Sequence, residues 1–183
     1  MPEFLIQMSG CPGSGKSTIA RAIGRRIGAI VLDHDVLKSA LLENGVETQK
    51  AGGVSYGSLR AMAGSILDQG FSVILDHPCY YEQILQGGLQ LAQRTGAVYR
   101  YIECVIDDLD EIRRRLKHRA SLASQLDDIA VPDQYWDQSS SGAELFKKWM
   151  RDMKRPTHSY LKIDTSLPLP QCLETVWTFL DQK

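Results

Sequence analysis

The sequence predicts an α/β fold built on a five-stranded parallel sheet. Short apolar runs alternate with amphipathic stretches along the whole chain, which is the pattern of repeated βαβ units. A glycine-rich turn joins the first apolar run to the first amphipathic stretch. The 183 residues are enough for one domain with a sizeable core and too few for two, so we expect a single domain over residues 1–183.

Each predicted strand is a short apolar run, and each predicted helix has apolar residues three or four positions apart. In residues 16–27, for example, Ile19, Ile23 and Ile27 fall on one helical face. The strands are predicted at residues 4–8, 29–33, 71–76, 98–104 and 160–164. The helices are predicted at residues 16–27, 36–43, 56–69, 81–94, 108–119 and 170–181.

Two segments do not fit this alternation. Residues 44–54 are polar and contain glycine, and residues 121–142 contain Asp, Gln, Ser and Pro. Long irregular stretches in a compact domain usually cover a ligand site, although a plain surface insertion gives the same pattern. We expect at least one of them to be a mobile cover over substrate or nucleotide, with a lid or insertion at about residues 115–155.

The composition argues against several classes of protein. The chain has 21 Lys and Arg against 22 Asp and Glu, and the net charge of −1 argues against a broad electrostatic hold on nucleic acid or an anionic membrane. We expect neither a signal peptide nor a membrane span, because no suitable apolar run is present. The four cysteines are far apart in the sequence, so we expect no disulfide framework or zinc site and favour a cytoplasmic protein, either a monomer or a homodimer.

The glycine-rich turn reads Gly-Cys-Pro-Gly-Ser-Gly-Lys-Ser at residues 10–17 and matches G-x-x-x-x-G-K-[ST] at every fixed position. Its glycines allow successive N–H groups to point at phosphate oxygens, and the following helix adds its positive N-terminal end. Lys16 would contact the β- and γ-phosphates, and the Ser17 hydroxyl is a hard ligand for Mg²⁺. A plain strand-to-helix turn would not require Lys16 and Ser17. The predicted phosphate-binding residues are Gly10, Cys11, Pro12, Gly13, Ser14, Gly15, Lys16, Ser17 and Thr18.

Acidic residues follow two of the predicted strands. Asp33 and Asp35 point to the same side if their segment is extended, and Asp76 ends the third apolar run. Ligands of open α/β sheets bind beyond the carboxyl ends of the strands, so we expect these carboxylates near the phosphate loop. Asp35 is the candidate base for an attacking hydroxyl, or it only caps the following helix. Asp33 and Asp76 are candidates to hold Mg²⁺ together with Ser17.

Aromatic and basic residues complete the candidate site. His77 and Tyr80 follow the third strand and are candidates to line a substrate pocket, with ordinary loop packing as the alternative. In the helix predicted at residues 108–119, Arg115 and Arg119 lie four positions apart beside the buried stripe. One guanidinium could stack on an adenine ring while the other stabilises charge on a transferred phosphoryl group, or both could belong to a solvated face.

The order of these motifs is informative beyond each motif alone. Residues 10–17 are followed by Leu-Asp-His-Asp-Val-Leu-Lys at 32–38, the apolar run at 73–76, Arg-Leu-Lys-His-Arg at 115–119 and Ile-Asp-Thr-Ser at 163–166. This order resembles the small P-loop kinases of the adenylate-kinase-like group over essentially the whole chain. Within that group the chain is most similar to the AAA-type ATP-binding small kinases, the branch of chloramphenicol phosphotransferase, zeta toxins, adenylylsulfate kinase, gluconate kinase and polynucleotide 5′-kinase domains.

The resemblance implies a P-loop NTPase three-layer sandwich with strand order 2-3-1-4-5, and ATP with Mg²⁺ as the phosphoryl donor. It implies that Asp35 is the catalytic base, that Arg115 stacks on adenine and that Arg119 contacts phosphate. It also places Asp164 in the segment beside the adenine, and Lys38 where many members have an arginine that grips the acceptor or the moving phosphate.

We therefore expect an ATP-dependent phosphotransferase that acts on a hydroxyl of a small molecule. Lys16, Mg²⁺ and Arg119 would stabilise the transferred phosphoryl group. Two alternatives remain: a nucleotide hydrolase or switch, which needs no base at the position of Asp35, and a polynucleotide-end kinase, against which the net charge counts. The candidate acceptor contacts are Asp35, Lys38, His77 and Tyr80.

Overall fold

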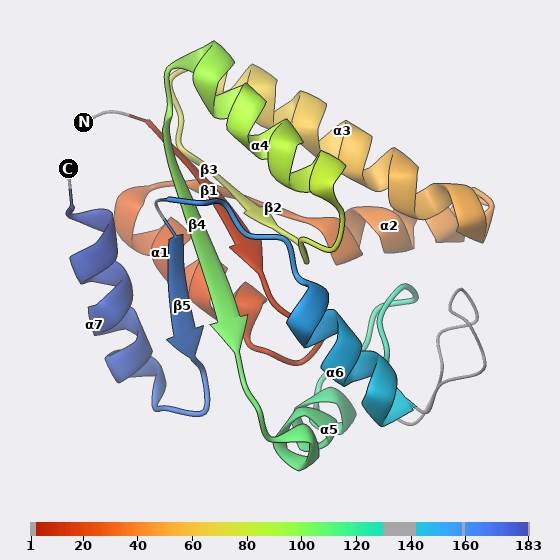
Figure 1. Cartoon of the computed structure of the whole chain (residues 1–183). Helices are drawn as coiled ribbons and strands as arrows, with labels where there is room; N and C mark the ends of the chain where they lie inside the picture. Colours follow the sequence, from red (N-terminus) through yellow and green to blue (C-terminus); the bar gives the residue numbers. More distant parts are fainter. Residues whose placement is uncertain (1–2, 130–141, 159, 183) are drawn as a thin grey trace.

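The computed structural model describes residues 3–129, 142–158 and 160–182, and its strands form one five-stranded sheet. Every pair of neighbouring strands is parallel, in the order β2-β3-β1-β4-β5, with β1 at the centre. This arrangement confirms the predicted strand order (Figure 1). The strands are β1 Phe4–Ser9, β2 Ile30–Asp33, β3 Val73–Asp76, β4 Val98–Val105 and β5 Tyr160–Asp164.

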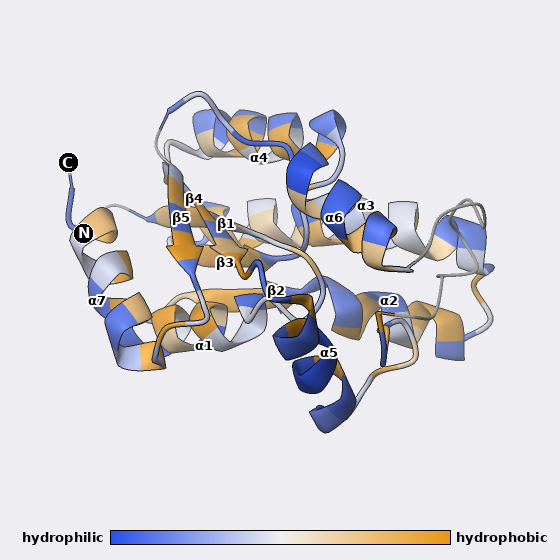
Figure 2. Ribbon diagram, turned by 60° about the horizontal axis from the view of Figure 1, so that its bottom comes forward, coloured by the Kyte–Doolittle hydropathy of each residue, from blue (hydrophilic) through white to orange (hydrophobic). Residues whose placement is uncertain are grey.

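Helices cover both faces of the sheet and give the predicted three layers. Alternate residues of β1 face opposite sides, so Ile6 and Met8 pack with α1 and α7, whereas Leu5 packs with α3 and α4. Figure 2 shows the largely apolar strands between amphipathic helices, and α5 as mostly hydrophilic. The helices are α1 Lys16–Ile27, α2 His34–Glu43, α3 Thr48–Asp68, α4 Glu82–Thr95, α5 Leu109–His118, α6 Gly142–Asp152 and α7 Leu169–Leu180.

Two helices and a connecting segment lie at the carboxyl edge of the sheet. In Figure 1, α5 lies beyond the arrowhead of β4, and α6 lies beside it. A separate apolar cluster joins them, with Phe146 and Trp149 of α6 packed near Ile112 and Leu116 of α5. Helix α6 and the last turn of α5 fall inside the lid or insertion predicted at about residues 115–155, of which residues 130–141 lie outside the described residues.

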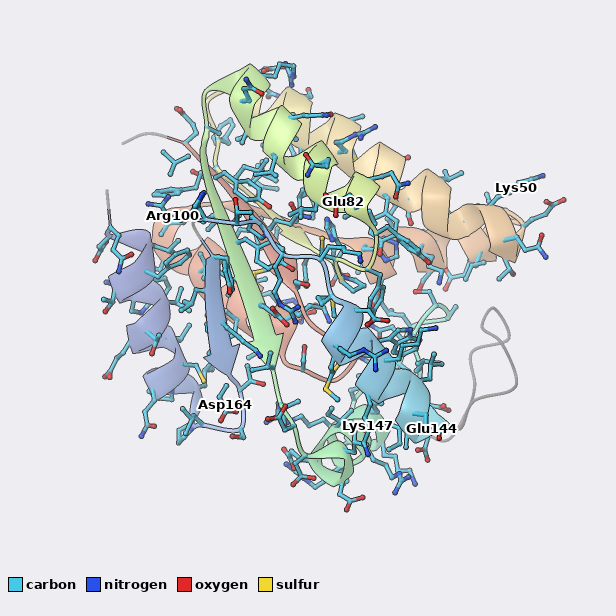
Figure 3. The ribbon with its side chains drawn as sticks, viewed as in Figure 1. Lys50, Glu82, Arg100, Glu144, Lys147 and Asp164 are labelled. Carbon is cyan, nitrogen blue, oxygen red and sulfur yellow. The ribbon has the colours of Figure 1, made fainter. Side chains whose placement is uncertain are left out.

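The chain that returns from α6 to β5 is anchored to the sheet by a buried ion pair. The guanidinium of Arg155 donates from Nε and Nη2 to the two carboxylate oxygens of Glu103 on β4, at 2.5 and 2.7 Å. The side chain of Glu103 is almost fully buried, so removing Arg155 would leave a buried charge uncompensated. By contrast, Lys147 and Glu144 of α6 are exposed (Figure 3).

The prediction that residues 44–54 are irregular is wrong for the second half of that segment. Helix α3 begins at Thr48 and not at residue 56. Gly52 and Gly53 obscure the helical pattern because glycine is a poor helix former, while Ala51 is fully buried and fixes this turn against the protein. Tertiary packing here outweighs local propensity. In the described parts of the chain, no helix is long and apolar enough to cross a membrane.

The glycines of α3 and α4 generate a stability prediction with a built-in control. Gly57→Ala should raise the free energy of unfolding by about 0.5–1 kcal/mol, because alanine favours the helix and its Cβ would meet no described atom within 4 Å. Gly88→Ala should lower it by about 1–3 kcal/mol, the usual cost of overpacking, because its Cβ would lie 2.1 Å from Oε1 of the buried Gln7. Urea unfolding followed by circular dichroism measures both; effects of the same sign would contradict this packing.

Candidate active site

The glycine-rich turn leaves β1 and enters α1 with positive φ angles that its glycines permit. Gly10 has a φ of 133°, and a Cβ there would lie 2.3 Å from the carbonyl oxygen of Cys104. Gly15 has a φ of 84° and stands at the N-cap of α1, where it brings no side chain to the first free N–H groups of the helix. Lys16 folds back and donates from Nζ to the carbonyl of Cys11 at 2.9 Å. The free N–H groups at the start of α1 make the turn suited to binding phosphate.

Asp33 and Asp35 take different positions from those predicted. Strand β2 ends at Asp33 and α2 begins immediately, so the pair is not extended and the prediction of a shared side is wrong. Oδ1 of Asp33 accepts from the N–H groups of Asp35 and Val36 at 2.9 and 3.3 Å, and its Oδ2 accepts from Arg21 at 3.3 Å. Asp33 is therefore the N-cap of α2, and the alternative that Asp35 is the cap is wrong.

Asp35 stands in the first turn of α2 with partners on both carboxylate oxygens. Its Oδ2 accepts from Nε2 of Gln125 at 2.7 Å, and its Oδ1 lies 3.4 Å from Nδ1 of His34. Burial by itself would raise the pKa of Asp35, but the hydrogen bonds from His34 and Gln125, together with the charge of Lys16, outweigh it and lower the pKa to about 2. Asp35 is thus ionised at neutral pH and can accept a hydrogen bond from a hydroxyl.

Asp76 ends β3 directly beside β1 and has an unusual environment. Its side chain is 3% exposed, and neither carboxylate oxygen makes a well-formed hydrogen bond among the described residues. Burial raises its pKa to about 6, although the positive charge of Lys16 and the nearby hydroxyl of Ser17 oppose the shift. A buried carboxylate without a donor is costly unless a cation compensates it. Asp76 and Ser17, which line one cavity, therefore fit a Mg²⁺ ion.

The donor set is small, which limits how such an ion would be held. Within the described ranges, no three His, Cys, Asp or Glu side chains gather in a way that could hold a metal ion. Mg²⁺ usually keeps several waters and binds through one or two protein oxygens together with nucleotide phosphates. Ser17 and Asp76 suit that mode, whereas the carboxylate of Asp33 is already used by the helix cap and Arg21.

Two cavities open at the carboxyl edge of the sheet. The phosphate-loop cavity, about 670 Å³, is lined by residues of the glycine-rich turn and the start of α1 and by Asp76 and Arg115. The α3 cavity, about 800 Å³, is lined by residues of α2 and α3 and by the segment after β3. The two cavities share five lining residues, and these form the boundary between them: Pro12, Asp35, Pro78, Arg119 and Gln125.

The α3 cavity has aromatic, polar and basic walls. Lys38 of α2 and Tyr80 line it, whereas His77 lines the phosphate-loop cavity. Burial lowers the pKa of His77 to about 3, so this imidazole is neutral at pH 7. Gly52 and Gly53 expose bare helical backbone toward the same space, and a Cβ at either would meet no described atom within 4 Å. A molecule of moderate size could lie against this surface.

The arginine pair and the turn after β5 close the other side of the phosphate-loop cavity. Arg115 donates to Oε1 of Glu111 and to the carbonyl oxygen of Thr165, both at 2.7 Å, and so is fixed across the cavity. Helix α5 ends at His118, so Arg119 has an extended backbone and is not helical as predicted, yet it lines both cavities. Asp164, at the end of β5 (Figure 3), is exposed and accepts from its neighbour Ser166.

Three residues near the site were not predicted. His34 is buried, stacks on Tyr56 with ring centroids 4.1 Å apart and meets the Ser55 hydroxyl at 2.8 Å. Gln125 contacts Asp35, and Thr165 donates to the carbonyl oxygen of Ser14 at 2.8 Å. His34 and Thr165 lie within two of the sequence motifs, at residues 32–38 and 163–166, whereas Gln125 is brought to the site by tertiary structure.

The parallel sheet and the glycine-rich turn between β1 and α1 define a P-loop NTPase α/β fold. A family model described as an AAA domain matches residues 5–146, and the chain belongs to this AAA domain family. A comparison with curated proteins finds no match.

Solved structures confirm the fold. A sugar kinase from Janibacter sp. HTCC2649 is 19% identical with a TM-score of 0.68, over 98% of this chain and 95% of that chain. The APS kinase of Mycobacterium tuberculosis, in complex with AMPPNP and APS, is 16% identical with a TM-score of 0.64, over 99% of both chains. A gluconokinase from Sinorhizobium meliloti 1021 is 15% identical with a TM-score of 0.61, over 98% of this chain and 91% of that chain.

The buried carboxylate of Asp76 generates a pH-dependent stability prediction. Its pKa is about 6 in the folded protein and 3.8 as the ordinary value, so the folded state loses stability as pH rises from about 4 to about 6. At pH 7 the free energy of unfolding of Asp76→Asn should therefore exceed that of the unliganded wild type by up to about 3 kcal/mol. The variant should accordingly unfold at a higher urea concentration. The difference should shrink toward zero near pH 4. A variant less stable than the wild type at pH 7 would show that the carboxylate is compensated within the protein.

Proposed function

We propose that the protein is an ATP-dependent phosphotransferase that moves the γ-phosphoryl group of ATP to a hydroxyl of a small molecule. The observation that carries this proposal is the meeting of the two cavities at Asp35 and Arg119. A nucleotide hydrolase needs one cavity for the nucleotide and water. A second, larger cavity that adjoins a carboxylate beside the phosphate loop is what transfer to an acceptor requires.

Membership of the AAA domain family and the kinase fold support the same proposal. The sugar kinase, the APS kinase and the gluconokinase named above are all kinases by description, and each aligns with almost the whole chain. Their acceptors differ, so the shared fold supports phosphoryl transfer in general. The acceptor of this protein is to be found by experiment.

The phosphate-loop cavity would hold the donor. The free N–H groups at the start of α1 and the ammonium group of Lys16 would bind the phosphates, and Ser17 and Asp76 would hold Mg²⁺. When bound, Mg²⁺ neutralises charge that develops on the phosphate oxygens. Arg115, already fixed against Thr165, would lie along the adenine, next to the turn that contains Asp164.

The residues at the boundary would carry the transfer. The acceptor oxygen forms a bond to the γ-phosphorus, the bond from that phosphorus to the bridging oxygen breaks, and ADP leaves. The carboxylate of Asp35 takes the hydroxyl proton, and Arg119 stabilises the charge spread over the moving phosphoryl oxygens. Lys38, Tyr80 and, from the phosphate-loop side, His77 would position the acceptor.

A pair of variants tests this proposal in a screen for ATP consumption over sugars, nucleosides, antibiotics and phosphorylated metabolites. Lys16→Ala should lose ATP turnover with every acceptor. Asp35→Asn should bind ATP as the wild type does in calorimetry but transfer the phosphoryl group about 10²–10⁴ times more slowly, the usual contribution of a general base.

A matched control comes from another helix N-terminus. Asp110 also lies in the first turn of its helix but is exposed, so Asp110→Asn should transfer normally. Full transfer by Asp35→Asn would show that Asp35 is not the base. ATP turnover that no acceptor increases would support a hydrolase or switch instead.

A further inference from the structure

The amide of Gln125 is hydrogen-bonded to the carboxylate of Asp35, the base of the proposed transfer. Its Nε2 donates to Oδ2 of Asp35 at 2.7 Å, across 90 positions of sequence. The other oxygen, Oδ1, faces Nδ1 of His34 at 3.4 Å. Both oxygens of Asp35 therefore have a neighbour within the protein, and Gln125 stands on the boundary between the two cavities.

The orientation of this amide is fixed by its own neighbours. The N–H group of Leu122 donates to Oε1 of Gln125 at 3.2 Å, so the nitrogen end of the amide must face Asp35. Ser124, which directly precedes Gln125, donates from its N–H group to the hydroxyl oxygen of Ser39 at 3.0 Å. Its own hydroxyl donates to the carbonyl oxygen of Asp35 at 3.1 Å. The contact of Gln125 with Asp35 thus belongs to a segment docked on the start of α2.

The segment is also connected to the arginine at the boundary. Nη2 of Arg119 donates to the carbonyl oxygen of Leu126 at 2.7 Å. A group that pushes Gln125 away from Asp35 would therefore also disturb Arg119, the residue placed to stabilise the phosphoryl group. A large acceptor in the α3 cavity can supply binding energy for that rearrangement, whereas a water molecule cannot.

We propose that Gln125 is a specificity-determining residue that directs the phosphoryl group to the acceptor and away from water. This inference rests on the proposed function. Without an acceptor, the amide donates to Oδ2 of Asp35, and this hydrogen bond makes the carboxylate a weaker base toward a water molecule. An acceptor hydroxyl that enters from the α3 cavity replaces the amide and gives its proton to Oδ2, while its oxygen bonds to the γ-phosphorus of ATP and the bridging bond breaks to release ADP.

The test measures ATP hydrolysis with Mg²⁺ and ATP alone, with no acceptor present. Gln125→Ala should hydrolyse ATP roughly tenfold faster than the wild type, the factor expected for loss of one hydrogen bond to a charged group. Gln86→Ala is the matched control, because Gln86 donates to the carboxylate of Glu82 at 2.8 Å on the exposed face of α4. This control should hydrolyse ATP at the wild-type rate.

A second comparison checks that the gain operates through Asp35. In an Asp35→Asn background, adding Gln125→Ala should give no increase. An unchanged or lower rate in Gln125→Ala, or an increase that persists without the Asp35 carboxylate, would overturn the inference while leaving the proposed function intact. If wild-type protein and Gln125→Ala both fail to bind ATP in calorimetry, the proposed function fails, and this inference fails with it.

Discussion

The candidate site depends on the parallel pairing of β1 with both of its neighbours. Because β1 is central and every strand runs in the same direction, the chain leaves β1, β2 and β3 at one edge of the sheet. The register sets Asp33 opposite Asp76, and the phosphate loop emerges from the adjoining strand. One constraint of the fold thus brings together the N–H groups that can bind phosphate and several carboxylates. At this short separation the carboxylates repel one another.

This gathering is costly in the absence of ligand. Asp76 is buried without a well-formed hydrogen bond among the described residues, and the negative charges of Asp33 and Asp35 add to the burial that raises its pKa. Sites that are poised for charged ligands commonly store such unfavourable features, because the ligand compensates them when it binds. The hydrophobic clusters on both faces of the sheet, and the buried pair of Glu103 and Arg155, hold the frame in place meanwhile.

The sequence predicted the parts of the molecule that local patterns encode. Strand positions and the phosphate loop follow from apolar runs and a motif of fixed spacing. The strand order is what the resemblance to the small P-loop kinases implies, and the structure confirms it. The sequence alone could not reveal that Asp33 caps α2, since an acidic pair after a strand is compatible with an extended segment or a helix start. Nor could it show the start of α3 at Thr48, which depends on packing, or the approach of Gln125 to Asp35 from a distant segment.

The most direct measurement is the affinity for ATP by calorimetry with and without Mg²⁺, in the wild type and in Asp76→Asn. If the edge of the sheet is a site for ATP with Mg²⁺, the ion should strengthen ATP binding to the wild type, and the variant should lose most of that gain while it binds free ATP at least as tightly. An equal gain from Mg²⁺ in both proteins would contradict the assignment of the buried carboxylate, and no binding of ATP to either would contradict the site itself.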